Sequence, residues 1–192
     1  WGEVAMEDQA SFEAMLPEWD KVLTWLIANR QNYVHWVLLW AEDWQDFANS
    51  ALRQDRLRTL VERAHRFDLF VGVDVPIALE QQHAWRLIRN EGELDAELTE
   101  LRANVDYLME AGFDYLATES GTSEFTHPDP QRILEWMNEL ARYLDEEWNG
   151  AEAFIKVHVS AGQSAEGFAD PVTGEDINSN FLPYHADSRL GV

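Results

Sequence analysis

Two glutamates near the middle of the chain are the residues best suited to catalysis. Glu119 and Glu124 lie in the segment ATESGTSEF, which directly follows the apolar lead-in GFDYL. A third carboxylate, Asp74, stands near the end of another apolar run, LFVGVDV. Hydrolysis of a glycosidic bond needs one carboxylic acid that protonates the leaving oxygen and a second group that stabilises the positive centre formed in the sugar. We therefore predict Glu119 as the general acid and Glu124 or Asp74 as the second carboxylate.

Other side chains could hold a sugar beside these carboxylates. Trp40 and Asp43 lie in the segment WAEDW, where an indole could stack on a sugar ring and a carboxylate could accept hydrogen bonds from hydroxyl groups. His35, Lys156 and His158 lie on predicted strands. We predict that these five residues bind the substrate.

The same residue types also suit a metal-dependent barrel enzyme, either a hydrolase or an isomerase. Such an enzyme needs a set of oxygen and nitrogen ligands for Mg²⁺, Mn²⁺ or Zn²⁺. The sequence offers Asp74, Glu119, His158 and His185. For the glycosidase no cofactor is expected, whereas this alternative would require a divalent metal.

Two further alternatives remain. The segment FIKVHVSAG resembles the lysine strand of class I aldolases, which implies a lyase that forms a Schiff base on Lys156. The same lysine could instead form an internal ion pair with Glu119 or Asp74. A non-catalytic carbohydrate-binding domain would share the tryptophan-rich loops without needing a proton donor. The residues favour a hydrolase but leave open whether the chain is an enzyme.

Secondary structure has to bring these residues together. Four short apolar runs predict strands, and amphipathic segments around them predict helices. The strands are expected at 33–40, 69–75, 115–118 and 153–159, and the helices at 18–29, 52–66, 78–90, 94–111 and 130–148. Side chains alternate between the two faces of a strand. Alternation therefore predicts one face, polar at its C-terminal end, that carries Asp74, Glu119, Lys156 and His158.

Strands that alternate with helices predict a parallel sheet. We expect one α/β domain over residues 1–192, built as part of a (β/α)8 barrel, because a complete barrel needs about 250 residues. An open, doubly wound sheet is the alternative fold. The stretch 162–192 is rich in Gly, Ser, Asn, Asp and Pro, and is expected to be a long loop. The abrupt ends suggest a segment of a longer chain, which would supply the remaining units.

Part of the sequence resembles β-hexosaminidases and related glycoside hydrolases. WLIANRQNYVHWVLLWAED resembles a helix-to-strand step of their barrels, FDLFVGVDVP resembles the next strand, and GFDYLATES resembles the strand that carries the catalytic acid pair. The resemblance implies a barrel that acts on a small or oligomeric sugar, with Glu119 at the proton-donor position. The acidic pair of those families is missing, because Glu119 lies between Thr118 and Ser120.

Composition limits the remaining possibilities. The 192 residues carry a formal net charge of −22, which argues against nucleic acid or an anionic membrane surface as partner. The sequence contains no cysteine, and this excludes disulfides and thiolate ligands. No signal peptide and no apolar run of about 20 residues is visible, so we expect a soluble protein and leave its compartment open.

Overall fold

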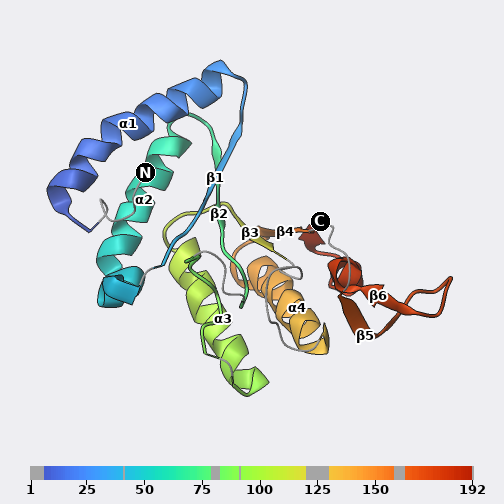
Figure 1. Cartoon of the computed structure of the whole chain (residues 1–192). Helices are drawn as coiled ribbons and strands as arrows, with labels where there is room; N and C mark the ends of the chain where they lie inside the picture. The colour runs from blue at the N-terminus through green and yellow to red at the C-terminus, as the bar shows by residue number, and fades with distance from the viewer. Residues whose placement is uncertain are drawn as a thin grey trace.

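The computed structural model describes residues 7–40, 42–78, 83–90, 92–119, 130–157 and 163–191, apart from the side chains of Glu42, Asp43, Gln45 and Glu119. Helices and strands alternate along most of this chain (Figure 1). In chain order they are α1 (Gln9–Ala28), β1 (Tyr33–Val37), η2 (Glu42–Asn49), α2 (Ala51–His65), β2 (Phe70–Asp74), α3 (Leu94–Met109), β3 (Tyr115–Glu119), α4 (Pro130–Glu147), β4 (Glu152–Lys156), β5 (Ser164–Ala169), β6 (Asp176–Asn178), η3 (Ser179–His185) and β7 (Leu190–Gly191).

Five parallel strands form the main sheet, in the order β1-β2-β3-β4-β7. Each strand therefore pairs with the preceding strand of the same sheet. In a doubly wound sheet the order in which successive strands are added would reverse at one point, and helices would cover both faces. The consecutive order is that of a barrel segment, and the five strands do not close into a barrel.

Local sequence determines where the helices begin and which sides they bury. The Asp8 carboxylate accepts a hydrogen bond from the Ser11 N–H at 2.7 Å, which caps α1, and Ser50 caps α2 through the Arg53 N–H at 3.1 Å. The apolar positions of α2 recur at helical spacing and are buried. They are Leu57, Leu60, Val61 and Ala64. Among the described residues, no helix combines the length and the apolarity required to cross a membrane.

One face of the main sheet is covered by helices and the other is exposed. Val71 and Val73 of β2 and Ala153 and Ile155 of β4 are buried in the core that the helices share. The opposite face carries large exposed side chains, although parallel sheets are ordinarily covered on both faces. Tyr33 and Phe70 are 53% exposed, Val37 is 49% exposed and Phe154 is 38% exposed. We call this second side the open face; in a closed barrel it would be the interior.

Aromatic rings occupy space on the open face that two glycines leave free. A Cβ atom on Gly72 would lie 2.2 Å from the ring of Tyr115, and one on Gly191 would lie 2.5 Å from the ring of Phe154. Tyr33 stacks on Phe70 with ring centroids 5.3 Å apart. At each glycine, a large side chain from the neighbouring strand can therefore lie over the strand that contains the glycine.

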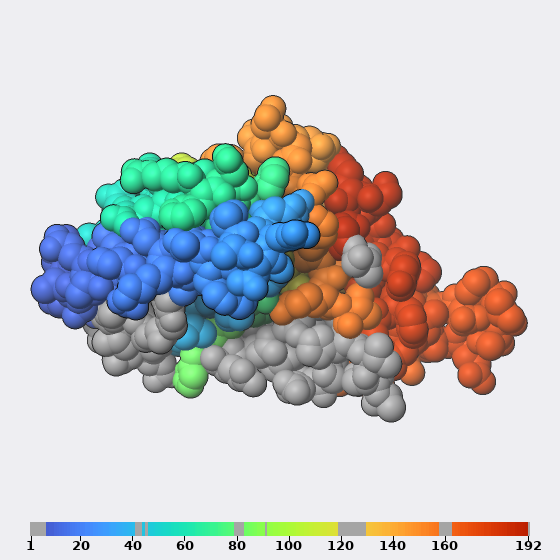
Figure 2. Space-filling model, turned by 90° about the horizontal axis from the view of Figure 1, so that it is seen from above, coloured from blue at the N-terminus to red at the C-terminus, as the bar shows by residue number. Residues whose placement is uncertain are grey.

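Two regions differ from the sequence-based prediction. The helix expected at 78–90 is not formed in the described residues 83–90, where Leu39 and Ala84 instead form an isolated bridge. The stretch 162–192, expected to be a long loop, contains the antiparallel pair β5–β6, the short helix η3 and the edge strand β7. Figure 2 shows the orange-red segment of this hairpin extending beyond the body of the molecule.

Candidate active site

An ion pair occupies the C-terminal end of the open face. The Lys156 Nζ atom donates a hydrogen bond to the Asp74 Oδ2 atom at 2.5 Å. The two residues come from β4 and β2, with β3 between them, and Asp74 is in register with Ala117 of β3. The small side chain of Ala117 leaves space for the long lysine to cross that strand. The Asp74 side chain is 8% exposed and that of Lys156 is 47% exposed.

This contact bears on the Schiff-base alternative. Attack on a carbonyl requires an amine that is free to approach it, whereas the Lys156 amine donates a hydrogen bond to the Asp74 carboxylate. The structure therefore agrees with the internal ion pair to Asp74 that the sequence offered as the structural role of Lys156.

Glu119 is the last residue of β3, and the backbone register sets it opposite Lys156. Its Cα lies two residues beyond the position of β3 that pairs with Asp74. With strands about 4.8 Å apart and a rise of about 3.3 Å per residue, the Cα atoms of Glu119 and Asp74 are about 8 Å apart. Three of the predicted residues thus occupy neighbouring positions at the same ends of three strands, the ends where α/β proteins place their active sites.

A second polar contact lies farther down the open face. The Nδ1 atom of His35 on β1 is 3.1 Å from the Tyr115 hydroxyl on β3. His35 is exposed, whereas Tyr115 is 7% exposed. Burial raises the pKa of Tyr115, and nearby Tyr33, Asp114 and Asp74 add to the increase. Tyr115 is therefore a neutral phenol at neutral pH.

The predicted stacking residue, Trp40, is partly covered by an arginine. The guanidinium carbon of Arg89 lies 5.2 Å from the centre of the Trp40 ring and 5.4 Å from that of Trp85. Burial lowers the pKa of Arg89 to about 10, and the positive charges of Arg86 and Arg53 contribute to the decrease. A sugar could reach Trp40 only at a part of the ring that Arg89 leaves open.

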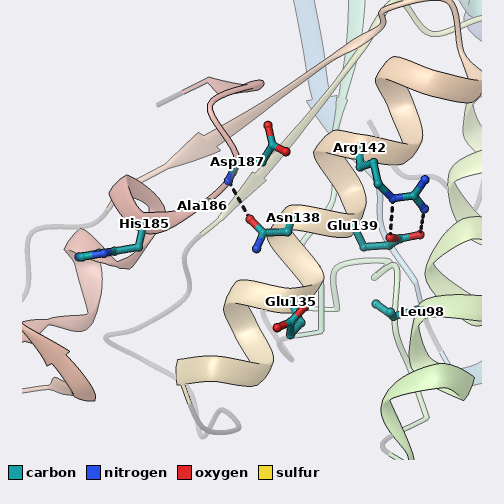
Figure 3. Close-up of a pocket in the computed structure, with 8 residues that line it drawn as sticks. All are labelled: Leu98, Glu135, Asn138, Glu139, Arg142, His185, Ala186 and Asp187. Atoms are coloured by element: carbon teal, nitrogen blue, oxygen red, sulfur yellow. Dashed lines mark hydrogen bonds and ion pairs between the residues drawn. The ribbon is translucent and has the colours of Figure 1, made fainter.

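Among the described residues, no group of three or more His, Asp or Glu side chains could hold a metal ion. Of the predicted metal ligands, Asp74 and His185 have described side chains, whereas His158 and the side chain of Glu119 lie outside the described part of the chain. His185 lies on η3, where its ring contacts Phe168 at 5.4 Å. It lines a groove of about 450 Å³ beside α4 (Figure 3). Asp74 does not line this groove.

The groove in Figure 3 lies where α3, α4 and the segment after η3 meet. Glu139 of α4 accepts hydrogen bonds from Arg142 and from Arg102 of α3. Burial raises the pKa of Glu139, but these hydrogen bonds outweigh it, so the pKa lies below its ordinary value. Asn138 accepts the backbone N–H of Asp187 at 2.7 Å. These polar groups hold α3, α4 and the segment after η3 together.

Some predicted residues lie outside the described part of the chain. They are Glu124, His158 and the side chains of Glu119 and Asp43. No functional role was predicted for Tyr115 or Gly72. A tyrosine at the apolar start of a strand carries no charge that would mark it. Gly72, on the strand next to His35, was the available signal, because the missing side chain at this position of β2 allows residues of β1 and β3 to touch across it.

No protein-family model and no curated protein sequence matches the chain. Solved structures do match. CpGH84B has a TM-score of 0.60 at 14% identity and the O-GlcNAc hydrolase of Thermobaculum terrenum, in a mutant form, 0.59 at 10%; each match covers 91% of this chain. CpGH84D has a TM-score of 0.57 at 11% identity over 90% of the chain.

The matches cover 29%, 36% and 27% of those three chains, so this chain spans about a third or less of their length. At this identity the similarity concerns the fold. The resemblance to glycoside-hydrolase barrels that the sequence indicated is confirmed at that level. The described chain has the fold of a segment of such a barrel, with a five-stranded parallel sheet that is open on its inner side.

Proposed function

We propose that this chain is part of a glycoside hydrolase in which Glu119 is the general acid. Asp74 or Glu124 is the second carboxylate, and Lys156, His35 and His158 contact the sugar together with Trp40 and Asp43. The observation that carries the proposal is the Asp74–Lys156 pair at the C-terminal strand ends, with Glu119 at the adjacent position of β3. The fold similarity to glycoside hydrolases supports the same reaction class.

The substrate is a small or oligomeric saccharide. One of the similar structures is an O-GlcNAc hydrolase, so aryl N-acetylglucosaminides belong in the first assay panel. The panel must also contain other aryl glycosides, because Glu119 is flanked by Thr118 and Ser120 where a pair of acids would assist an N-acetyl group.

We further infer that additional parallel strands cover the open face and complete the barrel. The support is physical: the aromatic side chains of that face are exposed, and β1 and β7 are both edge strands. The similar structures are also much longer than this chain. The extra strands belong to a longer form of the same polypeptide, and the assays below use that longer protein.

The test of the proposed acid is Glu119→Gln, which keeps the shape of the side chain and removes its proton. The variant is expected to lose about 10²–10⁴-fold in kcat while it still binds the sugar, since general acid catalysis contributes about this much. Hydrolysis of the active aryl glycoside and calorimetric binding of its product would be measured in parallel.

Glu152→Gln is the matched control, because Glu152 is exposed at the opposite, N-terminal end of β4. It should keep full activity. Unchanged turnover in Glu119→Gln would refute the proposed acid. Loss of a bound metal from that variant would favour the metal-dependent alternative, and sugar binding without any turnover in the parent protein would favour a binding domain.

A further inference from the structure

The contact between His35 and Tyr115 depends on a gap in the strand between them. β2 separates β1 from β3, and Gly72 of β2 is in register with both residues. Since a Cβ atom on Gly72 would lie 2.2 Å from the Tyr115 ring, only glycine lets the ring lie across β2. The Tyr115 hydroxyl thereby reaches the Nδ1 atom of His35 at 3.1 Å.

The chemistry of the two groups determines which one donates. A phenol O–H is a stronger hydrogen-bond donor than an imidazole N–H. The unprotonated nitrogen of a neutral imidazole is a stronger acceptor than a phenol oxygen. The Tyr115 hydroxyl is held in its protonated form by burial, as described above. The hydroxyl therefore donates to Nδ1, and the single proton of the neutral imidazole resides on Nε2.

We propose that Tyr115 is a positioning residue that fixes His35 as the Nε2–H tautomer and directs this donor over the open face. His35 is exposed there, so the Nε2–H group is available to an oxygen acceptor such as a saccharide hydroxyl. This use of the donor rests on the proposed function. The tautomer itself follows from the contact between His35 and Tyr115 and does not depend on the substrate.

The tautomer can be read directly by NMR of protein labelled with ¹⁵N at histidine. At a pH of about 8 the imidazole of an ordinary histidine is neutral. The His35 signals, assigned by their loss in His35→Gln, should show a protonated Nε2 and an Nδ1 shifted as a hydrogen-bond acceptor. Tyr115→Phe keeps the ring over Gly72 and removes the donor, so Nδ1 should move to the position of a free acceptor and the two tautomers should exchange.

Tyr33→Phe is the matched control, because Tyr33 lies on the same face and stacks on Phe70. It should leave both His35 signals unchanged. A protonated Nδ1 in the parent protein, or identical His35 signals in the parent and in Tyr115→Phe, would overturn the proposal.

Kinetics then separate this proposal from the proposed function. In an active hydrolase, Tyr115→Phe should raise KM about 3- to 10-fold with little change in kcat, which corresponds to one weakened hydrogen bond. If Glu119→Gln keeps its turnover while the NMR result holds, the proposed reaction fails and the role of Tyr115 stands.

Discussion

At the scale of single residues, the Asp74–Lys156 pair sets the charge of the candidate site. A carboxylate that is 8% exposed needs a partner, and the protein has few cations to spare, with 14 basic residues against 36 acidic ones. Only two of the basic residues are lysines, Lys21 and Lys156. The two differ in surroundings, since Lys21 forms its ion pair with Glu18 at the surface, where the side chains are 72% and 61% exposed.

Replacement of Lys156 by Met should therefore destabilise the protein. The change leaves the Asp74 carboxylate buried without its cation, and we expect the free energy of unfolding to fall by about 1–3 kcal/mol, less than for a fully buried pair because Lys156 is half exposed. Urea unfolding followed by circular dichroism measures this loss. Adding Asp74→Asn to the Lys156→Met variant should restore at least half of the lost free energy of unfolding.

The other lysine provides the control. Lys21→Met removes a solvent-exposed ion pair, so the free energy of unfolding should change by less than about 0.5 kcal/mol. Equal effects of the two lysine substitutions would contradict a special role for the Asp74 contact.

Alternation along the strands predicted that Asp74 and Lys156 share one face, and both lie on the open face. The prediction could be made because a period of two follows from strand geometry alone. The pairing partner of each residue was beyond reach. Which side chains touch depends on register and on small residues such as Gly72 and Ala117, and the register is set by contacts distant in sequence.

At the scale of elements, a buried glutamate joins two helices. Glu97 lies in the first turn of α3, and its side chain is 3% exposed. It accepts hydrogen bonds from the Gly92 N–H at 2.9 Å, from Arg132 at 2.7 Å and from the Trp136 indole at 3.0 Å. Burial raises the pKa of Glu97, but these hydrogen bonds outweigh it, so the pKa lies below its ordinary value.

Glu97→Gln should weaken this junction. The amide loses the charge that strengthens the bonds, and the free energy of unfolding should fall by about 1.5–3 kcal/mol near neutral pH. Because the folded-state pKa is lowered, the carboxylate stabilises the fold above the ordinary pKa of about 4.5 and loses this effect as the pH falls through the lower folded value. Denaturant titrations at several pH values should show a difference that shrinks in acid.

Asp95→Asn serves as the control in the same turn of α3, because Asp95 is exposed. It should change the free energy of unfolding by less than about 0.5 kcal/mol. A loss in Glu97→Gln that stays constant from neutral pH to strongly acidic pH would contradict the assigned role of the charge.

Element types were predictable where a local pattern dominates. The helices α2, α3 and α4 and the four main strands follow apolar periodicity. The helix predicted at 78–90 was wrong in its described part, because the backbone there forms hydrogen bonds with other segments. The N–H groups of Trp85, Leu87 and Ile88 donate to the carbonyls of Leu38, Pro76 and Ile77. Such pairing overrides helix propensity and leaves no trace in the local sequence.

At the scale of the whole molecule, the net charge and the exposed open face both reduce the stability of the fold. A net charge of −22 makes the folded chain repel itself, and the open face exposes aromatic surface that a closed barrel would bury. Among the described residues, several ion pairs offset part of the repulsion, for example the pairing of Arg189 with Asp145 and Asp187.

Salt should stabilise the chain. Raising NaCl from about 0.05 to 0.5 M shortens the screening length from well above 10 Å to about 4 Å, which weakens repulsion between distant carboxylates more than contacts at hydrogen-bond distance. We expect the melting temperature to rise by about 2–8 °C, which corresponds to about 1–2 kcal/mol. Calorimetry at several salt concentrations measures it, with sucrose as an uncharged control. A melting temperature that falls with salt would mean that ion pairs dominate.

The consecutive order of the strands has a consequence for synthesis on the ribosome. β2 can dock on β1, β3 on β2 and β4 on β3 without waiting for any later segment, because each partner has already emerged. Translation proceeds at roughly 5–20 residues per second, far more slowly than a helix forms. The nascent chain can therefore mature unit by unit, each strand pairing with the one before it as it leaves the ribosome.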